Sequence, residues 1–316
     1  MIFKYCAVKQ RLSPLSRRDN HSTIGLIVIL MMPFIPLNAA DFSGALSSYE
    51  IKQDENLLTI ARHFNLGYVE LIAALPGIDP WHPEPNTVIQ LPTLHIIPDA
   101  AKRGVVINLG DFRLYWFSDA DKILPENNVE SWLIAIAREG FATPLGKTQV
   151  VKLRDNPSWM PTQSARHENP VLPFIVPPGP TNPLGRLAIN LGFHNIIIHG
   201  TNKPWGIGRR VSRGCIRMYP EDIAQLYQRV KIGTPVAIIN QPIKFGWHNK
   251  QLYVEIHPSW KQVDQLEYNG HFDLQIPTEL AALVRKKAGS KHPHINWLAV
   301  VTAARERSGI PVRILD

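Results

Sequence analysis

The distribution of proline constrains the fold of this chain most. The 316 residues include 27 prolines, and many of them stand between short apolar runs. Proline lacks a backbone N–H and fixes φ, so it interrupts helices, whereas short apolar runs bounded by turn residues are typical of strands. We therefore expect an α+β chain that is mostly β and has no long helices.

The size and composition indicate a folded chain of two domains. A globular domain has about 150 residues, and this chain has 316. Hydrophobic residues make up 45% of the sequence and charged residues 19%. This apolar content supplies a sizeable core and excludes a wholly disordered chain.

Residues 1–40 have the composition of a secretory signal. Five basic residues and one acidic residue precede an apolar run from Ile24 to Leu37, and Asn38-Ala39-Ala40 follows it. The run has fourteen residues and contains two prolines, so it is short for a membrane span. We expect a cleavable signal peptide and an exported protein, with a retained membrane anchor as the alternative.

The net charge gives little support for a nucleic-acid partner. The chain has 34 basic and 26 acidic residues, and residues 1–40 carry five of the basic and one of the acidic ones. The remainder therefore has 29 basic and 25 acidic residues, a formal charge of +4. Because the sequence has no dense basic run with interleaved aromatic residues, we predict no nucleic-acid binding.

Cysteine usage draws attention to one residue. Of the two cysteines, Cys6 lies in the predicted signal, so the exported protein has a single thiol at Cys215. Paired cysteines in an exported protein tend to form disulfides, and a lone cysteine is either an inert buried residue or a reactive thiol. The neighbours of Cys215 decide between these alternatives.

Residues 48–93 have the pattern of a small separate unit. A short strand is predicted at 49–52, and apolar residues then recur at helical spacing over 57–64. A second short helix ends before Pro76-Gly77, and a strand returns at 87–92. The predicted order is strand, helix, helix, strand.

From about residue 101 the sequence becomes rich in strands. The runs 104–109 and 113–117 flank Gly110-Asp111, which predicts a hairpin, and 132–137 is a further apolar run of strand length. We expect the proline-rich stretch at 156–183 to form walls that face a substrate, with disorder as the alternative.

A histidine and the lone cysteine follow a predicted buried strand. The run 195–198 is apolar and β-branched, and His199-Gly200-Thr201 comes at its end. Cys215 follows sixteen residues after His199, across a loop with prolines and glycines that can fold back toward the histidine. Pro220 then opens a predicted helix.

This pair of residues suits nucleophilic catalysis. A thiol is mostly protonated at neutral pH, whereas the thiolate is the nucleophile. A histidine within hydrogen-bond reach, here His199, takes the proton of Cys215 and later returns it to a leaving amine. Backbone N–H groups around Gly214-Cys215 are candidates to hold the oxyanion, because glycine permits a close approach.

Four further residues are candidates for substrate binding. Arg213 and Arg217 have the fork geometry that matches a carboxylate, and Gly200 and Thr201 stand beside the histidine. On spacing alone, a buried thiol beside a core histidine stays an alternative. We expect no metal site and no cofactor, because the sequence has no Cys-x-x-Cys and no His-Glu-x-x-His.

The motifs around both residues resemble the active-site signature of the YkuD-type L,D-transpeptidases. They are His199-Gly200-Thr201 and Ser212-Arg213-Gly214-Cys215-Ile216-Arg217. Thr143-Pro144-Leu145-Gly146 resembles the Thr-Pro-x-Gly element of the family. Many members have a histidine where this chain has Arg213.

Two other parts of the chain narrow the resemblance. Residues 48–93 are similar to a LysM module, through Gln53-Asp54-Glu55-Asn56-Leu57 and Leu75-Pro76-Gly77-Ile78-Asp79. Together with the stretch 178–185, this unit resembles the LysM-containing, periplasmic ErfK/YbiS/YcfS/YnhG group. The resemblance implies affinity for peptidoglycan glycan, and a packing module without such affinity is the alternative.

The resemblance implies a β-sandwich-like catalytic domain at 101–240 and a periplasmic enzyme of cell-wall biogenesis. The implied reaction is an attack of the Cys215 thiolate on the meso-diaminopimelate carbonyl of a peptidoglycan tetrapeptide stem, with release of D-Ala. An amine then takes the acyl group from the thioester. The resemblance also implies His199 as general base and acid, Ser212 and Gly214 as residues that shape the oxyanion loop, and carbapenems as covalent inhibitors.

Several points stay open at the level of sequence. The implied acyl acceptor is the C-terminal lysine of an outer-membrane lipoprotein, which the subgroup favours, or diaminopimelate of another stem, or water. A non-catalytic wall-binding protein and a cysteine peptidase of proteins are the alternative functions. Residues 241–316 predict a strand at 252–256 and two helices near 280–287 and 297–305, and they form an extension of unknown role.

Overall fold

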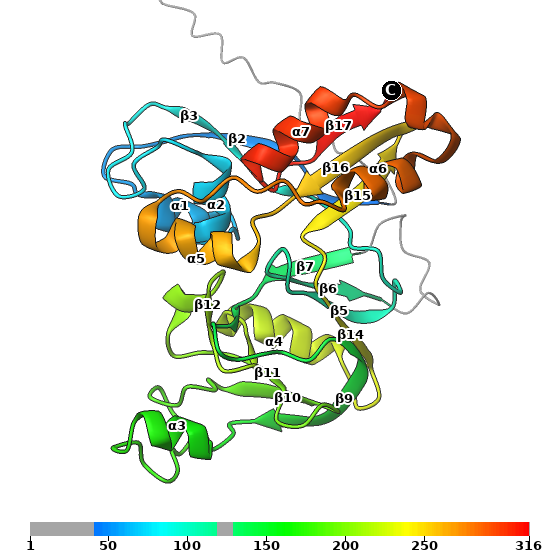
Figure 1. Ribbon diagram of the computed structural model, residues 1–316. Helices are drawn as coiled ribbons and strands as arrows, with labels where there is room; N and C mark the ends of the chain where they lie inside the picture. The colour runs from blue at the N-terminus through cyan, green and yellow to red at the C-terminus, as the bar shows by residue number, and fades with distance from the viewer. Residues whose placement is uncertain (1–40, 119–128, 316) are drawn as a thin grey trace, which may run out of the picture. The chain divides into compact units, whose positions relative to one another are not determined.

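The computed structural model describes residues 41–118 and 129–315 (Figure 1). The predicted signal peptide at 1–40 lies outside the described residues, so it stays a prediction. Among the helices of the described ranges, none is both long enough and apolar enough to cross a membrane.

The N-terminal unit has the predicted order of strand, helix, helix and strand. Its elements are β2 (Ser47–Glu50), α1 (Leu57–His63), α2 (Tyr68–Ala74) and β3 (Val88–Leu91), and β2 pairs antiparallel with β3. Asn56 starts α1, because its side chain accepts a hydrogen bond from the backbone N–H of Thr59 at 2.9 Å. A second strand pair, β1 (Phe42–Gly44) with β4 (Leu94–Ile96), flanks this unit.

One eight-stranded sheet forms the centre of the structure. In spatial order its strands are β13 (Ile216–Arg217), β11 (Ile197–His199), β10 (Leu187–Leu191), β9 (Gly146–Asp155), β14 (Pro235–Ile239), β5 (Gly104–Asn108), β6 (Arg113–Phe117) and β7 (Val129–Leu133). The hairpin predicted around Gly110-Asp111 is confirmed as β5 and β6.

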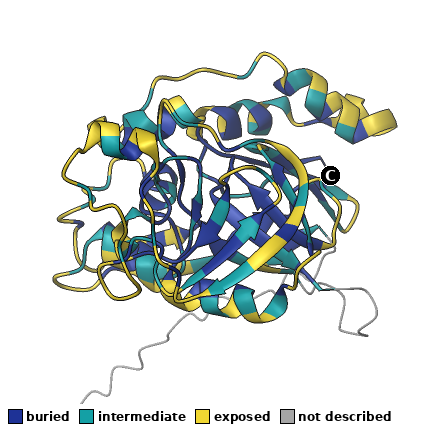
Figure 2. Ribbon diagram, turned by 90° about the horizontal axis from the view of Figure 1, so that it is seen from below, coloured by how far each residue is buried: buried dark blue, intermediate teal, exposed yellow. Residues whose placement is uncertain are grey.

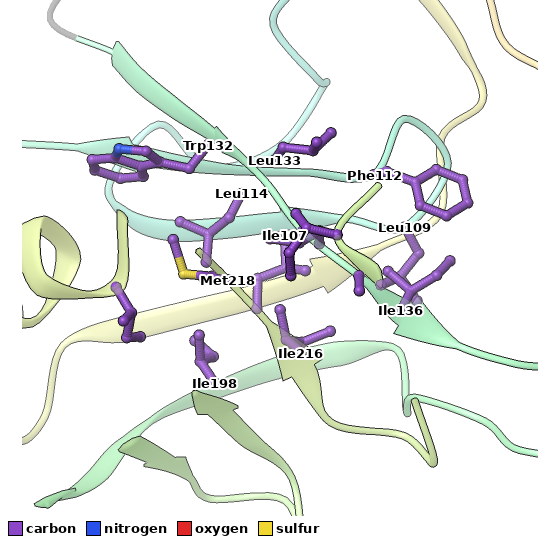
Figure 3. Close-up of a cluster of buried hydrophobic side chains, with 14 of the residues drawn as sticks. Ile107, Leu109, Phe112, Leu114, Trp132, Leu133, Ile136, Ile198, Ile216 and Met218 are labelled. Carbon is purple, nitrogen blue, oxygen red and sulfur yellow. The ribbon is translucent and has the colours of Figure 1, made fainter. Parts of the chain in front are cut away.

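The sheet curls because one long strand serves both of its halves. Over residues 146–149 β9 pairs with β14, and over 150–155 it pairs with β10. The two halves face each other across a shared core, where Ile107 and Leu114 lie opposite Ile198 and Ile216 (Figure 3). The catalytic part is therefore mostly β as predicted, but it is a single curled sheet and not two separate sheets of a sandwich.

One helix fills the core of the curled sheet. Helix α4 (Pro220–Arg229) begins with proline at its first turn, as predicted, and contributes Ile223 and Leu226 to the core. Figure 2 shows most strands at the centre of the molecule as buried, with largely exposed loops and helices around them.

One local prediction needs correction. The run 132–137 is not one strand, because β7 ends at Leu133 and β8 (Ile136–Ala137) pairs with β12 (Arg210–Ser212) instead. Between them Ala135 exchanges two backbone hydrogen bonds with Arg217, which turns the chain toward β13. The proline-rich stretch also contains a short helix, α3 (Gln163–Glu168).

The C-terminal extension has a small core of its own. The strands β15 (Ile243–His248), β16 (Gln251–Ile256) and β17 (Val312–Leu315) form an antiparallel sheet, and α6 (Leu280–Ala288) and α7 (Trp297–Glu306) pack on it. The predicted strand and both predicted helices are confirmed. Helix α5 (Trp260–Asn269) instead adds Val263 and Leu266 to the core of the central sheet.

Candidate active site

The strand that carries His199 is fixed by the residues that precede it. Ile198 is fully buried in the core, and β11 pairs with β10 on one side and with β13 on the other. The pairing with β13 is parallel, with His199 opposite Arg217. The chain therefore returns from His199 to the neighbouring strand at the residues that follow Cys215.

Strand register places four residues in one row across the sheet. Arg154 on β9 is opposite Ala188 on β10, Ala188 is opposite His199, and His199 is opposite Arg217. Register partners point to the same face of a sheet. This row therefore lies on the face that turns away from the core.

A second row next to the first contains the thiol. Asn190 is opposite Ile197 in the register of β10 and β11. Cys215 immediately precedes β13, and continuing the parallel register by one residue places it opposite Ile197, with whose backbone it forms a hydrogen bond. Cys215 and His199 therefore lie in neighbouring rows of the two adjoining chain segments.

The environment of His199 favours its neutral form. The ring is 5% exposed, and its Nδ1 atom lies 2.6 Å from the carbonyl oxygen of Gly200. A carbonyl only accepts hydrogen bonds, so in the neutral ring Nδ1 carries the proton and Nε2 is the nitrogen with the lone pair. Burial, and then the positive charge of Arg217, lower the pKa of His199 to about 4.

The environment of Cys215 favours the thiol over the thiolate. Burial raises the pKa of Cys215, while a hydrogen bond from the backbone of Ile197 and the charges of Arg217 and Arg154 oppose this rise. The Sγ–H group donates to the carbonyl oxygen of Asn195 at 3.5 Å. At neutral pH the resting pair is therefore a neutral thiol and a neutral imidazole.

The turn before Cys215 is held by side-chain hydrogen bonds. The Ser212 hydroxyl donates to the carbonyl oxygen of Cys215 at 2.6 Å and accepts from the N–H of Gly214 at 3.2 Å. Thr143 donates to the carbonyl oxygen of Gly214 at 2.9 Å. Gly214 has φ +112°, and a Cβ atom there would lie 3.0 Å from the carbonyl oxygen of Ala142, so this position needs glycine.

The two predicted carboxylate-binding arginines differ in their contacts. Arg213 forms an ion pair with Glu168 of α3, donates to the Ser164 hydroxyl at 3.2 Å and lies 4.9 Å from the ring centroid of Phe141. It therefore joins α3 to the cysteine turn. Arg217 is half-buried beside Cys215, and burial lowers its pKa.

Gly200 and Thr201 shape the turn after β11. The N–H of Gly200 donates to the carbonyl oxygen of Leu187, and the buried Thr201 hydroxyl accepts from the N–H of Lys203 at 2.9 Å. Their observed contacts are with backbone groups, which position His199.

Two residues of this face escaped the sequence analysis. Arg154 shares the row of His199, and Asn190 lies beside Ile197 in the row of Cys215. The Nε atom of Arg154 and the Oδ1 atom of Asn190 are buried without a hydrogen-bond partner among the described residues. The alternation Lys152-Leu153-Arg154 would have predicted a strand with a basic face.

Comparison with known proteins identifies the family. Residues 102–238 match the family model of YkuD, described as an L,D-transpeptidase catalytic domain. The chain is 34% identical over 264 residues to the Probable L,D-transpeptidase ErfK/SrfK of Escherichia coli (strain K12), covering 82% of either chain. It is 38% identical over 219 residues to the Probable L,D-transpeptidase YcfS of the same organism, covering 66% of this chain and 67% of that protein.

A solved structure is similar to part of this chain. The catalytic domain of the Enterococcus faecium L,D-transpeptidase, determined by NMR, aligns with a TM-score of 0.33 at 18% identity, over 45% of this chain and 99% of that one. The matches to ErfK/SrfK and to the YkuD model cover the strands that carry His199 and Cys215. The chain belongs to the YkuD family of L,D-transpeptidases.

Proposed function

We propose that this L,D-transpeptidase acts on the tetrapeptide stems of peptidoglycan, with Cys215 as the nucleophile and His199 as the general base. The proposal is carried by the position of His199 at the end of β11 and of Cys215 immediately before β13, the parallel neighbour of β11. The Nε2 lone pair of His199 supplies the base, since Nδ1 is engaged by Gly200.

The first half of the reaction forms a thioester. The proton of the Cys215 thiol passes to Nε2 of His199 as Sγ attacks the carbonyl carbon of meso-diaminopimelate. When the tetrahedral intermediate collapses, the bond to the D-Ala nitrogen breaks, and His199 returns the proton to that nitrogen. D-Ala leaves, and the stem stays attached to Cys215.

The second half transfers the stem to an acceptor. An amine loses a proton to His199 and attacks the thioester carbonyl, and Cys215 leaves and regains the proton. We favour a lipoprotein lysine as this amine, with diaminopimelate of another stem and water as the competing acceptors. Supplying the three acceptors in separate reactions, with detection of the products by mass, distinguishes them.

The oxyanion needs a donor on the cysteine turn. The N–H of Gly214 is already taken by the Ser212 hydroxyl, so we assign the oxyanion to the N–H of Cys215. Ser212 and Gly214 then act by holding the turn in shape and do not contact the substrate.

The low pKa of His199 is compatible with this mechanism. A neutral imidazole at neutral pH is ready to accept the thiol proton, and the charge appears only when the thiol is ionised. Arg217, beside Cys215, favours the thiolate as it forms.

A second activity concerns the N-terminal unit. We propose that it binds the glycan of peptidoglycan as a LysM-like module and so holds the periplasmic enzyme on its substrate. Trp81 is 52% exposed and lies 5.7 Å from the ring of Tyr68, in a loop that Asp79 ties down through the N–H groups of Trp81 and His82. An exposed, fixed aromatic ring is suited to stacking on a sugar.

The test of the cysteine chemistry is acylation by a carbapenem, followed by intact-mass spectrometry. The parent protein is expected to gain one adduct, and the Cys215→Ala variant none. His199→Ala is expected to lose acylation while keeping its melting temperature. Release of D-Ala from a tetrapeptide muropeptide by the parent, and not by Cys215→Ala, would identify the substrate.

Two outcomes would contradict the proposal. If the folded parent gained no adduct and released no D-Ala, but bound sacculi as well as Cys215→Ala does, the chain would be a wall-binding protein without activity. If His199→Ala kept normal turnover, another base would be at work.

A further inference from the structure

Arg154 and His199 lie on the same face of the sheet, two strands apart, and only Ala188 of β10 stands between them in their row. In the row of register partners Ala188 separates the two residues, and Ala188 is fully buried. Since alanine has no atoms beyond Cβ, the long side chain of Arg154 has room to extend toward the imidazole. The charge of Arg154 also lowers the pKa of both His199 and Cys215.

The guanidinium of Arg154 has no acidic partner in the structure. Its Nε is buried without a hydrogen bond, and among residues 41–118 and 129–315 no carboxylate forms an ion pair with it. The nearby Arg186 is different: its side chain is 77% exposed and pairs with Asp155 at 3.3 Å. A half-buried arginine with an unused donor beside a catalytic pair is typical of a ligand site.

A carboxylate is the group that this site fits. The guanidinium fork matches a carboxylate in shape and charge, and hydrogen bonds between ions are the strongest that proteins form. Each peptide that loses its C-terminal residue has such a group beside the scissile bond.

The order of residues in the row indicates which carboxylate Arg154 would meet. Arg217 and Cys215 lie on one side of His199, and Arg154 lies on the other. In the proposed reaction His199 protonates the leaving nitrogen. The carboxylate of the leaving residue is two bonds away from that nitrogen, so it lies on the side of His199 that faces away from the thiol.

We propose that Arg154 binds the free carboxylate of the leaving D-Ala and thereby restricts the enzyme to stems in which the residue after the scissile bond is the last. This inference rests on the proposed function. In a longer stem the same position is an amide, which offers no charge to Arg154 and leaves its buried donors unpaired.

The experiment compares two substrates that differ only in this group. One is a muropeptide tetrapeptide that ends in D-Ala, and the other ends in D-alaninamide. Release of D-Ala or of D-alaninamide is measured by mass spectrometry for the parent protein, Arg154→Gln, Arg154→Lys and the exposed control Arg186→Gln.

The parent is expected to prefer the acid over the amide by about 10- to 100-fold in kcat/KM. Arg154→Gln is expected to lose a similar factor on the acid and to change little on the amide, so that its preference disappears. Arg154→Lys keeps the charge and is expected to keep part of the preference for the acid. Arg186→Gln is expected to keep the full preference. Carbapenem acylation, which releases no D-Ala, serves as a readout of the thiol alone.

Three outcomes would overturn the inference. If Arg154→Gln reacted more slowly than the parent by the same factor with the acid, the amide and the carbapenem, Arg154 would act on the thiol or on His199. If Arg154→Gln kept the full preference for the acid over the amide, the carboxylate would bind elsewhere. If Arg154→Gln does not fold, the same conclusion follows from a full preference in Arg154→Lys. If the parent protein is acylated by the carbapenem but reacts equally fast with the acid and the amide, only the proposed role of Arg154 is refuted. If the parent protein reacts with none of the three compounds, the proposed function is refuted as well.

Discussion

The Nδ1 atom of His199 lies 2.6 Å from the carbonyl oxygen of Gly200, the residue that follows it in the chain. The backbone itself therefore fixes the tautomer of the base, and among the described residues no carboxylate side chain forms a hydrogen bond with this imidazole as third member of a triad. A carboxylate would raise the pKa of the imidazole, whereas here burial and Arg217 lower the pKa to about 4.

The first prediction concerns the pH dependence of acylation. His199 must be neutral to accept the thiol proton, and with a pKa of about 4 it loses this form only as the pH falls through 4. The acylation rate at pH 5 is therefore expected to be about 90% of that at pH 7, as far as His199 determines it. An unshifted histidine with a pKa of about 6.5 would leave about 4%. Stopped-flow measurement of carbapenem acylation between pH 4 and 8 distinguishes these values.

The second prediction concerns the cysteine turn. Ser212→Ala removes the hydroxyl that accepts from Gly214 and donates to Cys215, so the turn loses two hydrogen bonds. Acylation is expected to slow by about 10-fold, because the N–H of Cys215 is less well aimed at the oxyanion. The control is Ser48→Ala, at an exposed position of β2. Equal rates for Ser212→Ala and the parent would show that the turn holds its shape without the hydroxyl.

The sequence alone predicts the residues of the site that lie in local motifs. His199 follows a β-branched run, and Cys215 shortly precedes a helix that begins with Pro220, so both are visible within 25 residues. Arg154 is different, because its place beside His199 depends on the register of β9 with β10 and on a bulge at Asn190. Register is set by the pairing of distant strands, which periodicity does not reveal.

The same distinction holds for the rest of the fold. Short strands and the helix at Pro220 are marked by turn residues and apolar periodicity. Helix α3 is not, since it has six residues and buries only Ala165. Arg213 forms an ion pair with Glu168 of this helix. This contact depends on tertiary structure, so the sequence pattern does not predict it.

The third prediction gives the C-terminal extension a role in the active site. Arg209 pairs with Glu267 at 3.1 Å, and Arg210 forms an ion pair with Asp264, so helix α5 holds the strand that leads into the cysteine turn. Asp264→Ala is expected to reduce the acylation rate several-fold, because Arg210 loses its partner and β12 becomes less well fixed. The melting temperature is expected to change little, since single partly exposed ion pairs contribute about 1 kcal/mol or less.

The matched control for α5 is Lys261→Ala, an exposed position on the same helix. If Asp264→Ala and Lys261→Ala acylated equally fast, α5 would serve the packing of the extension only.

The fourth prediction concerns a buried cluster of charges. Glu255 accepts from Lys244 at 2.8 Å and from His257 at 2.6 Å, and Lys244 also pairs with Asp111 at 2.7 Å. Burial opposes the ionisation of Glu255, but Lys244, His257 and His95 hold its pKa well below the ordinary value. The cluster joins β16 to the β5–β6 turn.

Glu255→Gln is therefore expected to destabilise the protein strongly. It leaves the buried charge of Lys244 with Asp111 as the remaining carboxylate partner in this cluster, a change that costs about 3–5 kcal/mol in comparable buried pairs. The free energy of unfolding in urea measures it, with the exposed Glu279→Gln as control. A loss below about 1 kcal/mol would show that water or a rearranged Asp111 replaces the carboxylate.

The fifth prediction is a stabilising substitution. Asp222 lies in the first turn of α4, is 8% exposed, and its Oδ2 atom has no hydrogen-bond partner among the described residues. Burial, and then the charge of Glu221, raise the pKa of Asp222 to about 6, although Arg62 and Arg113 oppose the rise. The cost of burial thus exceeds the benefit of a negative charge at a helix N-terminus.

The sign of the pH dependence follows from the raised pKa. The folded state holds the proton of Asp222 more tightly than the unfolded state, so stability is highest below the ordinary value of 3.8 and falls as the pH rises through 6. Asp222→Asn has no such charge. It is expected to increase the free energy of unfolding by up to about 3 kcal/mol at pH 7.5 and by much less at pH 4.5. Urea unfolding of both proteins at the two pH values measures the difference, and Glu84→Gln, at an exposed loop position, is the control. A gain that is equal at both pH values would mean that the amide forms new hydrogen bonds and that the charge of Asp222 is not the cause.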